Sequence, residues 1–142
     1  MGVFQIIIDT NVFVAALRSK RGASYRLFRL LGDRRFEINV SVPLVLEYEK
    51  AATLLIRRGG LLARDIDDIL DYICTVARHR KIFYLWRPFL RDPKDDMVLE
   101  LAVAAQCDFI VTYNKKDFRG IGKFGIRALT PREFLEEIGA LE

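Results

Sequence analysis

The sequence contains very little cysteine and histidine, and this scarcity excludes several kinds of site. Cys74 and Cys107 are the only two cysteines, and neither belongs to a paired-cysteine motif. We therefore expect two buried free thiols rather than a disulfide framework or a cysteine zinc site. His79 is the only histidine, and its position between Arg78 and Arg80 favours the surface. A mechanism based on histidine is not expected.

Long apolar runs are also absent. No stretch reaches the roughly 20 apolar residues that a membrane-spanning helix requires. The run from Val3 to Ile8 is too short for the core of a signal peptide. The sequence also lacks internal repeats, low-complexity tracts and long linkers. We therefore expect a cytoplasmic protein without a membrane partner, folded as one domain over residues 1–142.

The charge balance is mildly basic. The 142 residues include 23 Lys and Arg against 19 Asp and Glu, which gives a formal net charge of +4. This excess is compatible with a nucleic-acid partner, but it does not indicate one by itself, because many basic proteins never bind nucleic acid. The hydrophobic fraction of 51% is typical of a folded globular protein.

Apolar runs alternate with helical patterns along the chain. Continuous apolar runs predict buried strands over 3–8 and 109–112, and weaker patterns predict strands over 36–40, 82–85 and 126–129. Helices are predicted between them, with Ser41, Asp65, Asp95 or Asp96, and Thr130 at four of the helix starts. This alternation predicts an α/β fold with a parallel central sheet of four to five strands and helices on both sides.

Polar residues follow the predicted strands at the edge where ligands bind in parallel sheets. Asp9 comes directly after Ile8, where it either caps the next helix or faces the binding edge. Glu47 lies on the helix after the second strand, on or beside its apolar face, where it is either a site residue or a solvated acid. Glu49 lies about 200° around that helix and is the ordinary surface candidate.

Two later segments add further polar groups. Asp92, Asp95 and Asp96 occupy five positions at a predicted helix start, where the helix dipole favours negative charge. Capping rarely needs three acids, so we interpret at least one as reaching the cleft. Thr112, Asn114 and Asp117 follow the late apolar strand, where an ordinary turn is the alternative.

Acids that converge from several strand ends require a cation between them. Without one, like charges raise one another's pKa strongly. Oxygen ligands without a histidine cluster select Mg²⁺ or Mn²⁺. Such an ion activates water and stabilises the charge that develops on a phosphodiester, which predicts hydrolysis of nucleic acid. Nearby loops carry cations that would hold phosphates or else form a solvated face, namely Lys20, Arg21, Lys115, Lys116 and Arg119.

Four segments, in order along the chain, together resemble the PIN domain. The resemblance is to its VapC-like ribonucleases, the toxins of bacterial toxin–antitoxin pairs. The segments are Ile-Ile-Ile-Asp9-Thr10-Asn11, Ser41 with Glu47-Tyr48, Asp92-Pro93-Lys94-Asp95-Asp96, and Ile-Val-Thr112-Tyr-Asn114-Lys-Lys-Asp117-Phe118. By this resemblance Asp9, Glu47 and Asp95 match the catalytic, metal-binding acids, and Asp96 is the rival for the third place. Asp92 is a further candidate acid.

The resemblance also implies an activity and partners. It implies metal-dependent hydrolysis of single-stranded or structured RNA with Mg²⁺ or Mn²⁺. The implied partners are a second copy, forming a homodimer, and a small antitoxin protein with a segment that blocks the cleft. The sequence leaves open the RNA target and whether one or two metal ions act.

One position departs from the family pattern. Many relatives carry an aspartate where Asn114 stands. Either Asp117 replaces it as the fourth acid and metal ligand, or three acids bind the metal; we favour Asp117. Asn11, Thr112 and Asn114 would then be supporting polar groups that orient carboxylates or water.

Two other interpretations of the acids remain. A catalytically degenerate RNA-binding or scaffold module would keep the fold, with Asn114 as the first loss. A receiver-like signalling domain would also gather acids and Mg²⁺ at strand ends, but it should show paired acids after the first strand and a lysine after a late one. Here a single Asp9 is followed by Thr-Asn, which disfavours the receiver.

Overall fold

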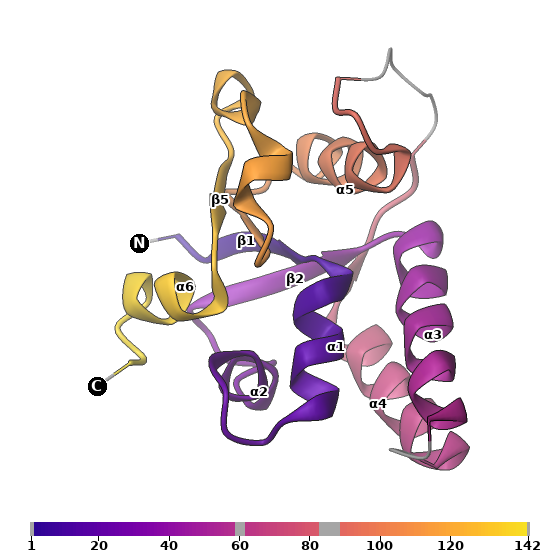
Figure 1. Cartoon of the computed structure of the whole chain (residues 1–142). Coiled ribbons are helices and arrows are strands. Elements are labelled where there is room, and N and C mark those ends of the chain that lie inside the picture. Colours follow the sequence, from indigo (N-terminus) through magenta and orange to yellow (C-terminus); the bar gives the residue numbers. More distant parts are fainter. Residues whose placement is uncertain (1, 59–61, 83–88, 142) are drawn as a thin grey trace.

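The computed structural model of the chain describes residues 2–58, 62–82 and 89–141 (Figure 1). These residues form an α/β fold around a five-stranded sheet in which every neighbouring pair is parallel. The strand order is β3-β2-β1-β4-β5. The strands are β1 (Phe4–Ile8), β2 (Phe36–Val40), β3 (Arg78–His79), β4 (Phe109–Val111) and β5 (Arg127–Leu129). The predicted parallel sheet is confirmed.

Helices cover both faces of this sheet, as expected. Figure 1 shows α5 and the 3-10 turns on one face and the other helices on the opposite face. The helices are α1 (Thr10–Arg18), α2 (Ala23–Arg29), α3 (Val42–Arg57), α4 (Ala63–Val76), α5 (Pro93–Ala104) and α6 (Pro131–Glu137), with 3-10 turns η1 (Lys115–Phe118) and η2 (Ile121–Phe124). None of the described helices is long and apolar enough to cross a membrane.

The third strand differs from the prediction. Strand β3 is formed by Arg78 and His79, which pair with the end of β2. The strand predicted over 82–85 is wrong at Ile82, and its residues 83–85 lie outside the described part of the chain. Both residues of β3 are exposed, so this edge strand carries no apolar pattern that a sequence could reveal. His79 is a surface residue, as predicted.

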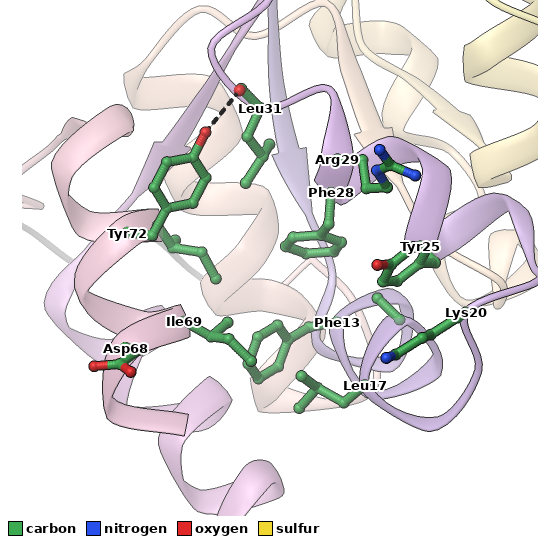
Figure 2. A pocket seen from close by; sticks show the side chains of 12 residues that line it. Phe13, Leu17, Lys20, Tyr25, Phe28, Arg29, Leu31, Asp68, Ile69 and Tyr72 are labelled. Atoms are coloured by element: carbon green, nitrogen blue, oxygen red, sulfur yellow. Dashed lines mark hydrogen bonds between the residues drawn. The ribbon is translucent and has the colours of Figure 1, made fainter. Parts of the chain in front are cut away.

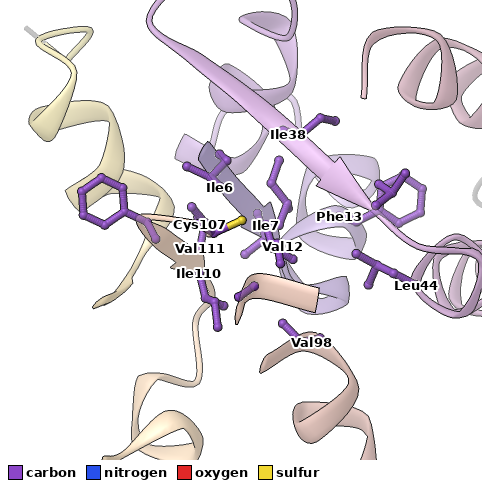
Figure 3. Packing of buried hydrophobic residues seen from close by; sticks show 14 of the residues in the cluster. Ile6, Ile7, Val12, Phe13, Ile38, Leu44, Val98, Cys107, Ile110 and Val111 are labelled. Atoms are coloured by element: carbon purple, nitrogen blue, oxygen red, sulfur yellow. The ribbon is translucent and has the colours of Figure 1, made fainter. Parts of the chain in front are cut away.

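The core forms on both faces of the central strand. Ile6, Ile7 and Ile8 are each at most 1% exposed, which explains why β1 is apolar throughout rather than alternating. Buried side chains from the strands, α1, α3 and α5 pack around it (Figure 3). Cys107 is a buried free thiol, as expected, whereas the free thiol of Cys74 is only half-buried. This core fixes the strand ends that carry the polar residues.

Local signals set the starts of the two helices that approach those strand ends. Ser41 caps α3, since its Oγ accepts a hydrogen bond from the Leu44 N–H at 3.3 Å. At α5 the predicted cap, Asp95 or Asp96, is wrong. Asp92 caps this helix instead, because Pro93 occupies the first turn and the Asp92 side chain accepts from Lys94 N–H. Both predicted caps therefore lie within the first turn of α5.

Candidate active site

Asp9 lies at the carboxyl end of β1 and begins α1. Its N–H donates to the Val111 carbonyl at 2.9 Å, which continues the pairing of β1 with β4. Its Oδ1 accepts from Thr10 N–H at 2.8 Å, so Asp9 does cap α1. The side chain also faces the strand ends, since Oδ2 accepts from Thr112 Oγ1 at 2.8 Å. Only 9% of Asp9 is exposed.

A network of polar groups holds this carboxylate in place. Asn11 Nδ2 donates to Asp9 Oδ2 and to Thr112 Oγ1, each at 3.2 Å. The fully buried Thr112 also accepts from Asn114 N–H at 3.0 Å. The structure therefore joins the predicted supporting residues Asn11, Thr112 and Asn114 to Asp9, with Asn114 contributing its backbone.

Asp95 and Asp117 extend the negative charge from two other elements. Burial raises the pKa of Asp95 to about 6, and the charges of Asp9, Asp92 and Asp117 add to the increase. Burial also raises the pKa of Asp9; the hydrogen bonds from Thr112 and Thr10 oppose this, and the charge of Asp117 adds to it. Asp95 is half-buried in the first turn of α5, and Asp117 is exposed on η1. Repulsion thus links three acids that are distant in sequence.

Glu47 approaches the same region from α3. Its side chain is half-buried, and its Oε2 lies 3.7 Å from Lys94 Nζ, in the first turn of α5. The neighbouring Tyr48 is buried and donates a hydrogen bond to the Ile8 carbonyl, just before Asp9. This bond fixes α3 to the end of β1, and with it the position of Glu47.

The two remaining acids of the α5 segment bind backbone groups. Asp96 Oδ1 accepts from Phe89 N–H at 3.1 Å and from Leu90 N–H at 2.8 Å. Asp92 Oδ1 accepts from Lys94 N–H at 2.9 Å. The structure therefore directs Asp92 and Asp96 toward the backbone and leaves Asp95 facing the charge of Asp9.

The donor chemistry of the cluster fits a hard divalent cation. Asp9, Asp95 and Asp117 supply only oxygen atoms, which suit Mg²⁺ or Mn²⁺, and their mutual repulsion is what a cation would relieve. Among the described residues no three acidic, cysteine or histidine side chains already stand in metal-binding geometry. The acids are thus neighbours rather than a closed metal cage.

The predicted phosphate-binding cations are dispersed. Lys115 Nζ binds Glu133 at 2.8 Å, whereas Lys116 and Arg119 are exposed without an ion pair to any described residue. Lys20 and Arg21 are exposed and follow the C-terminal end of α1, as expected, about 13 Å along that helix from Asp9. Whether they bind phosphates stays a prediction.

Lys20 also lines an apolar cavity of about 400 Å³ between α1, α2 and α4. Phe13, Phe28 and Ile69 point toward one another across it, and Lys20 and Asp68 lie at its margin (Figure 2). No pattern in the sequence indicates this cavity, because it arises from the way in which the apolar faces of three helices pack in the folded protein.

Comparison with known proteins assigns the fold. A family model described as the PIN domain matches residues 5–116. A chain in the crystal structure of VapBC2 from Rickettsia felis, bound to a DNA fragment from its promoter, superposes with a TM-score of 0.61. That match has 15% sequence identity and covers 88% of this chain and 98% of the other, so it shows a shared fold. No curated protein sequence matches the chain. The family match spans most of the chain, which therefore belongs to the PIN domain family.

Proposed function

We propose that this chain is a metal-dependent endoribonuclease that hydrolyses phosphodiester bonds of single-stranded RNA in the cytoplasm, as the toxin of a toxin–antitoxin pair. One observation carries the proposal. Burial and the charge of Asp9, which comes from a separate element, raise the pKa of Asp95 to about 6 at the carboxyl edge of a parallel sheet in a PIN domain. Repelling acids at a ligand-binding edge are a common arrangement of functional sites.

We assign the metal ligands to four acids. Asp9, Glu47 and Asp95 would hold Mg²⁺ or Mn²⁺, with Asp117 as the fourth acid in place of the one missing at Asn114. When bound, the ion supplies activation of water and stabilisation of charge on the phosphate. Thr112 and Asn11 orient Asp9 through its Oδ2.

The protein's own cations would position the RNA backbone. Lys116 and Arg119 lie on and directly after η1, the turn that also carries Asp117. Both are exposed, so they are available to bind phosphates. Lys115 contributes less, because Glu133 already binds it.

The test is cleavage of a mixed RNA pool by the purified protein in Mn²⁺, Mg²⁺ or EDTA. Asp9→Asn removes a ligand without removing core volume, and Asp67→Asn is the control, since Asp67 is an exposed acid on α4. We expect metal-dependent cleavage that is lost in Asp9→Asn and kept in Asp67→Asn. Equal activity of the two variants would remove Asp9 from the mechanism. RNA binding without cleavage under any metal would favour the degenerate RNA-binding module.

A small antitoxin is the proposed protein partner, in keeping with the VapBC2 complex whose fold this chain shares. The apolar cavity between α1, α2 and α4 is a suitable docking site, since large exposed apolar hollows commonly bind a partner. On co-expression with a candidate antitoxin, Ile69→Lys should abolish co-purification and Asp9→Asn should preserve it. A complex that survives Ile69→Lys would place the partner elsewhere.

We also propose a homodimer. Val42 and Leu46 lie one turn apart at the start of α3 and are 72% and 56% exposed. An exposed apolar pair is a suitable contact between copies. Light scattering on the purified protein should give twice the chain mass, and Leu46→Lys should reduce it to that of one chain. A monomeric wild type would contradict the proposal.

A further inference from the structure

Tyr113 presents an exposed aromatic ring at the edge that carries the acids. It follows Thr112 directly and is 46% exposed. Both ends of the residue are held in place. Its N–H donates to Asn11 Oδ1 at 3.2 Å, and its hydroxyl lies 2.5 Å from Ser24 Oγ, which is 1% exposed. The ring is therefore fixed in position although it faces solvent.

The same side chain that holds Tyr113 also holds Asp9. Asn11 accepts from Tyr113 N–H through Oδ1 and donates to Asp9 Oδ2 through Nδ2. Asn11 thus ties the Tyr113 backbone to this acid, and an RNA strand that extends from the acids toward Ser24 would reach the ring. Because the hydroxyl bond to Ser24 orders the ring and the bond to Asn11 orders its backbone, little conformational freedom is lost when a flat group packs on the ring.

A second exposed ring at this edge differs in one respect. Phe89 is 37% exposed, but Lys123 Nζ lies 4.3 Å from its ring centre. No cation or aromatic ring of the described residues packs on Tyr113 in this way. Of these two described rings, Tyr113 is thus the one with a face available to a ligand.

We propose that Tyr113 stacks on a nucleobase next to the scissile phosphate and so positions unpaired RNA. Unstacked bases of single strands pack readily on aromatic side chains, whereas paired bases do not present their faces. The proposal rests on the proposed nuclease function and adds to it a residue that selects for unpaired RNA. It requires no hydrogen-bond readout of the base, so the preference would be for strandedness rather than sequence.

The experiment measures binding in EDTA, so that it does not depend on catalysis. All proteins carry Asp9→Asn, and the probe is a fluorescein-labelled single-stranded RNA that the wild type cleaves, or its duplex, followed by fluorescence anisotropy. Tyr113→Leu should weaken single-strand binding about tenfold and leave duplex binding unchanged. Tyr113→Phe keeps the ring and should bind within about threefold of the parent. Leu54→Ala, at a half-exposed residue far along α3, is the control and should match the parent.

A probe with one abasic site adds a stricter criterion. An abasic site at the stacked position should weaken the parent and Tyr113→Phe, but it should not weaken Tyr113→Leu further. Unchanged single-strand binding by a folded Tyr113→Leu protein, checked by its thermal unfolding, would overturn the proposal. An equal loss for the duplex would also overturn it. If the wild type instead cuts no RNA in any metal, the proposed nuclease function fails, which is a separate outcome from these binding results.

Discussion

The Thr112 hydroxyl donates a 2.8 Å hydrogen bond to Asp9 Oδ2, although the two residues are 103 positions apart in sequence. The bond joins the ends of β4 and β1, whose last residues Val111 and Ile8 pair directly. It is also the largest influence opposing the effect of burial on the pKa of Asp9. The pairing of β1 with β4 thereby places a donor that favours the ionised state of Asp9, the state in which it would bind a cation.

Replacing this hydroxyl should weaken metal binding. Thr112→Val keeps the side-chain shape but leaves Asn114 N–H and Asp9 Oδ2 each without one partner. We expect about a tenfold loss of Mn²⁺ affinity by calorimetry, since groups that orient a metal ligand usually contribute that much. We also expect a loss of about 1–3 kcal/mol in the free energy of unfolding. Thr112→Ser keeps the hydroxyl and should restore both; Mn²⁺ affinity unchanged in Thr112→Val would contradict this role.

Most of the fold follows from local patterns in the sequence. The strand predicted over 36–40 has the bounds of β2, and Ser41 and Thr130 cap the helices that follow them, as expected. These features depend on residue type and period, which the sequence contains in full. The predicted helix start at Asp65 is wrong, since α4 begins at Ala63 and Asp65 lies in its first turn. Strand β3 depends only on where two exposed residues happen to pair, so nothing in its sequence indicates it.

The acid cluster should make the metal-free protein less stable at neutral than at acidic pH. The pKa of Asp95 rises from 3.8 to about 6 on folding, so the folded state holds this proton more tightly. The stabilisation that protonated Asp95 contributes to the folded state is complete below about pH 4 and is lost as the pH rises through about 6.

Thermal unfolding in EDTA can isolate this contribution. Asp95→Asn cannot ionise, so its melting temperature should approach that of the wild type at pH 4 and exceed it increasingly toward pH 7. Mn²⁺ should raise the wild-type value at pH 7 more than that of the variant. A difference between the two proteins that does not change with pH would contradict the shifted pKa.

Lys94 should compete with the metal for Glu47. Its ammonium lies 3.7 Å from Glu47 Oε2, but 64% of its side chain is exposed, so the ion pair is weak. Lys94→Ala should therefore strengthen Mn²⁺ binding modestly, about two- to fivefold, because an exposed ion pair contributes up to about 1 kcal/mol. Arg64→Ala removes an exposed cation from α4 and is the control. Weaker Mn²⁺ binding in Lys94→Ala alone would mean that Lys94 positions Glu47 instead.

The sequence indicates which acids approach the candidate site, but not what each acid does there. The rule for strand ends located Asp9, because it depends on topology alone, and the excess of acids at one helix start indicated those of α5. Neither signal distinguishes the roles of Asp95 and Asp96. Those roles depend on which of the two carboxylates reaches the N–H groups of Phe89 and Leu90. The bond between Ser24 and Tyr113 spans 89 positions and likewise has no signature in sequence spacing.

Replacing Asp95 or Asp96 by alanine should therefore have different effects, one on RNA cleavage and the other on stability. Asp96→Ala leaves Phe89 N–H and Leu90 N–H without their acceptor, so the free energy of unfolding should fall by about 1–3 kcal/mol. Asp95→Ala removes a repelling charge and should not destabilise the metal-free protein, yet it should abolish metal-dependent RNA cleavage.

Urea unfolding in EDTA and cleavage in Mn²⁺ separate the two effects within one pair of adjacent acids. At a temperature where Asp96→Ala remains folded, it should retain cleavage that Asp95→Ala has lost. If Asp95→Ala instead retains cleavage and a folded Asp96→Ala has lost it, Asp96 is the metal ligand. The loss of activity would then follow Asp96 although its carboxylate also accepts from the backbone of Phe89 and Leu90.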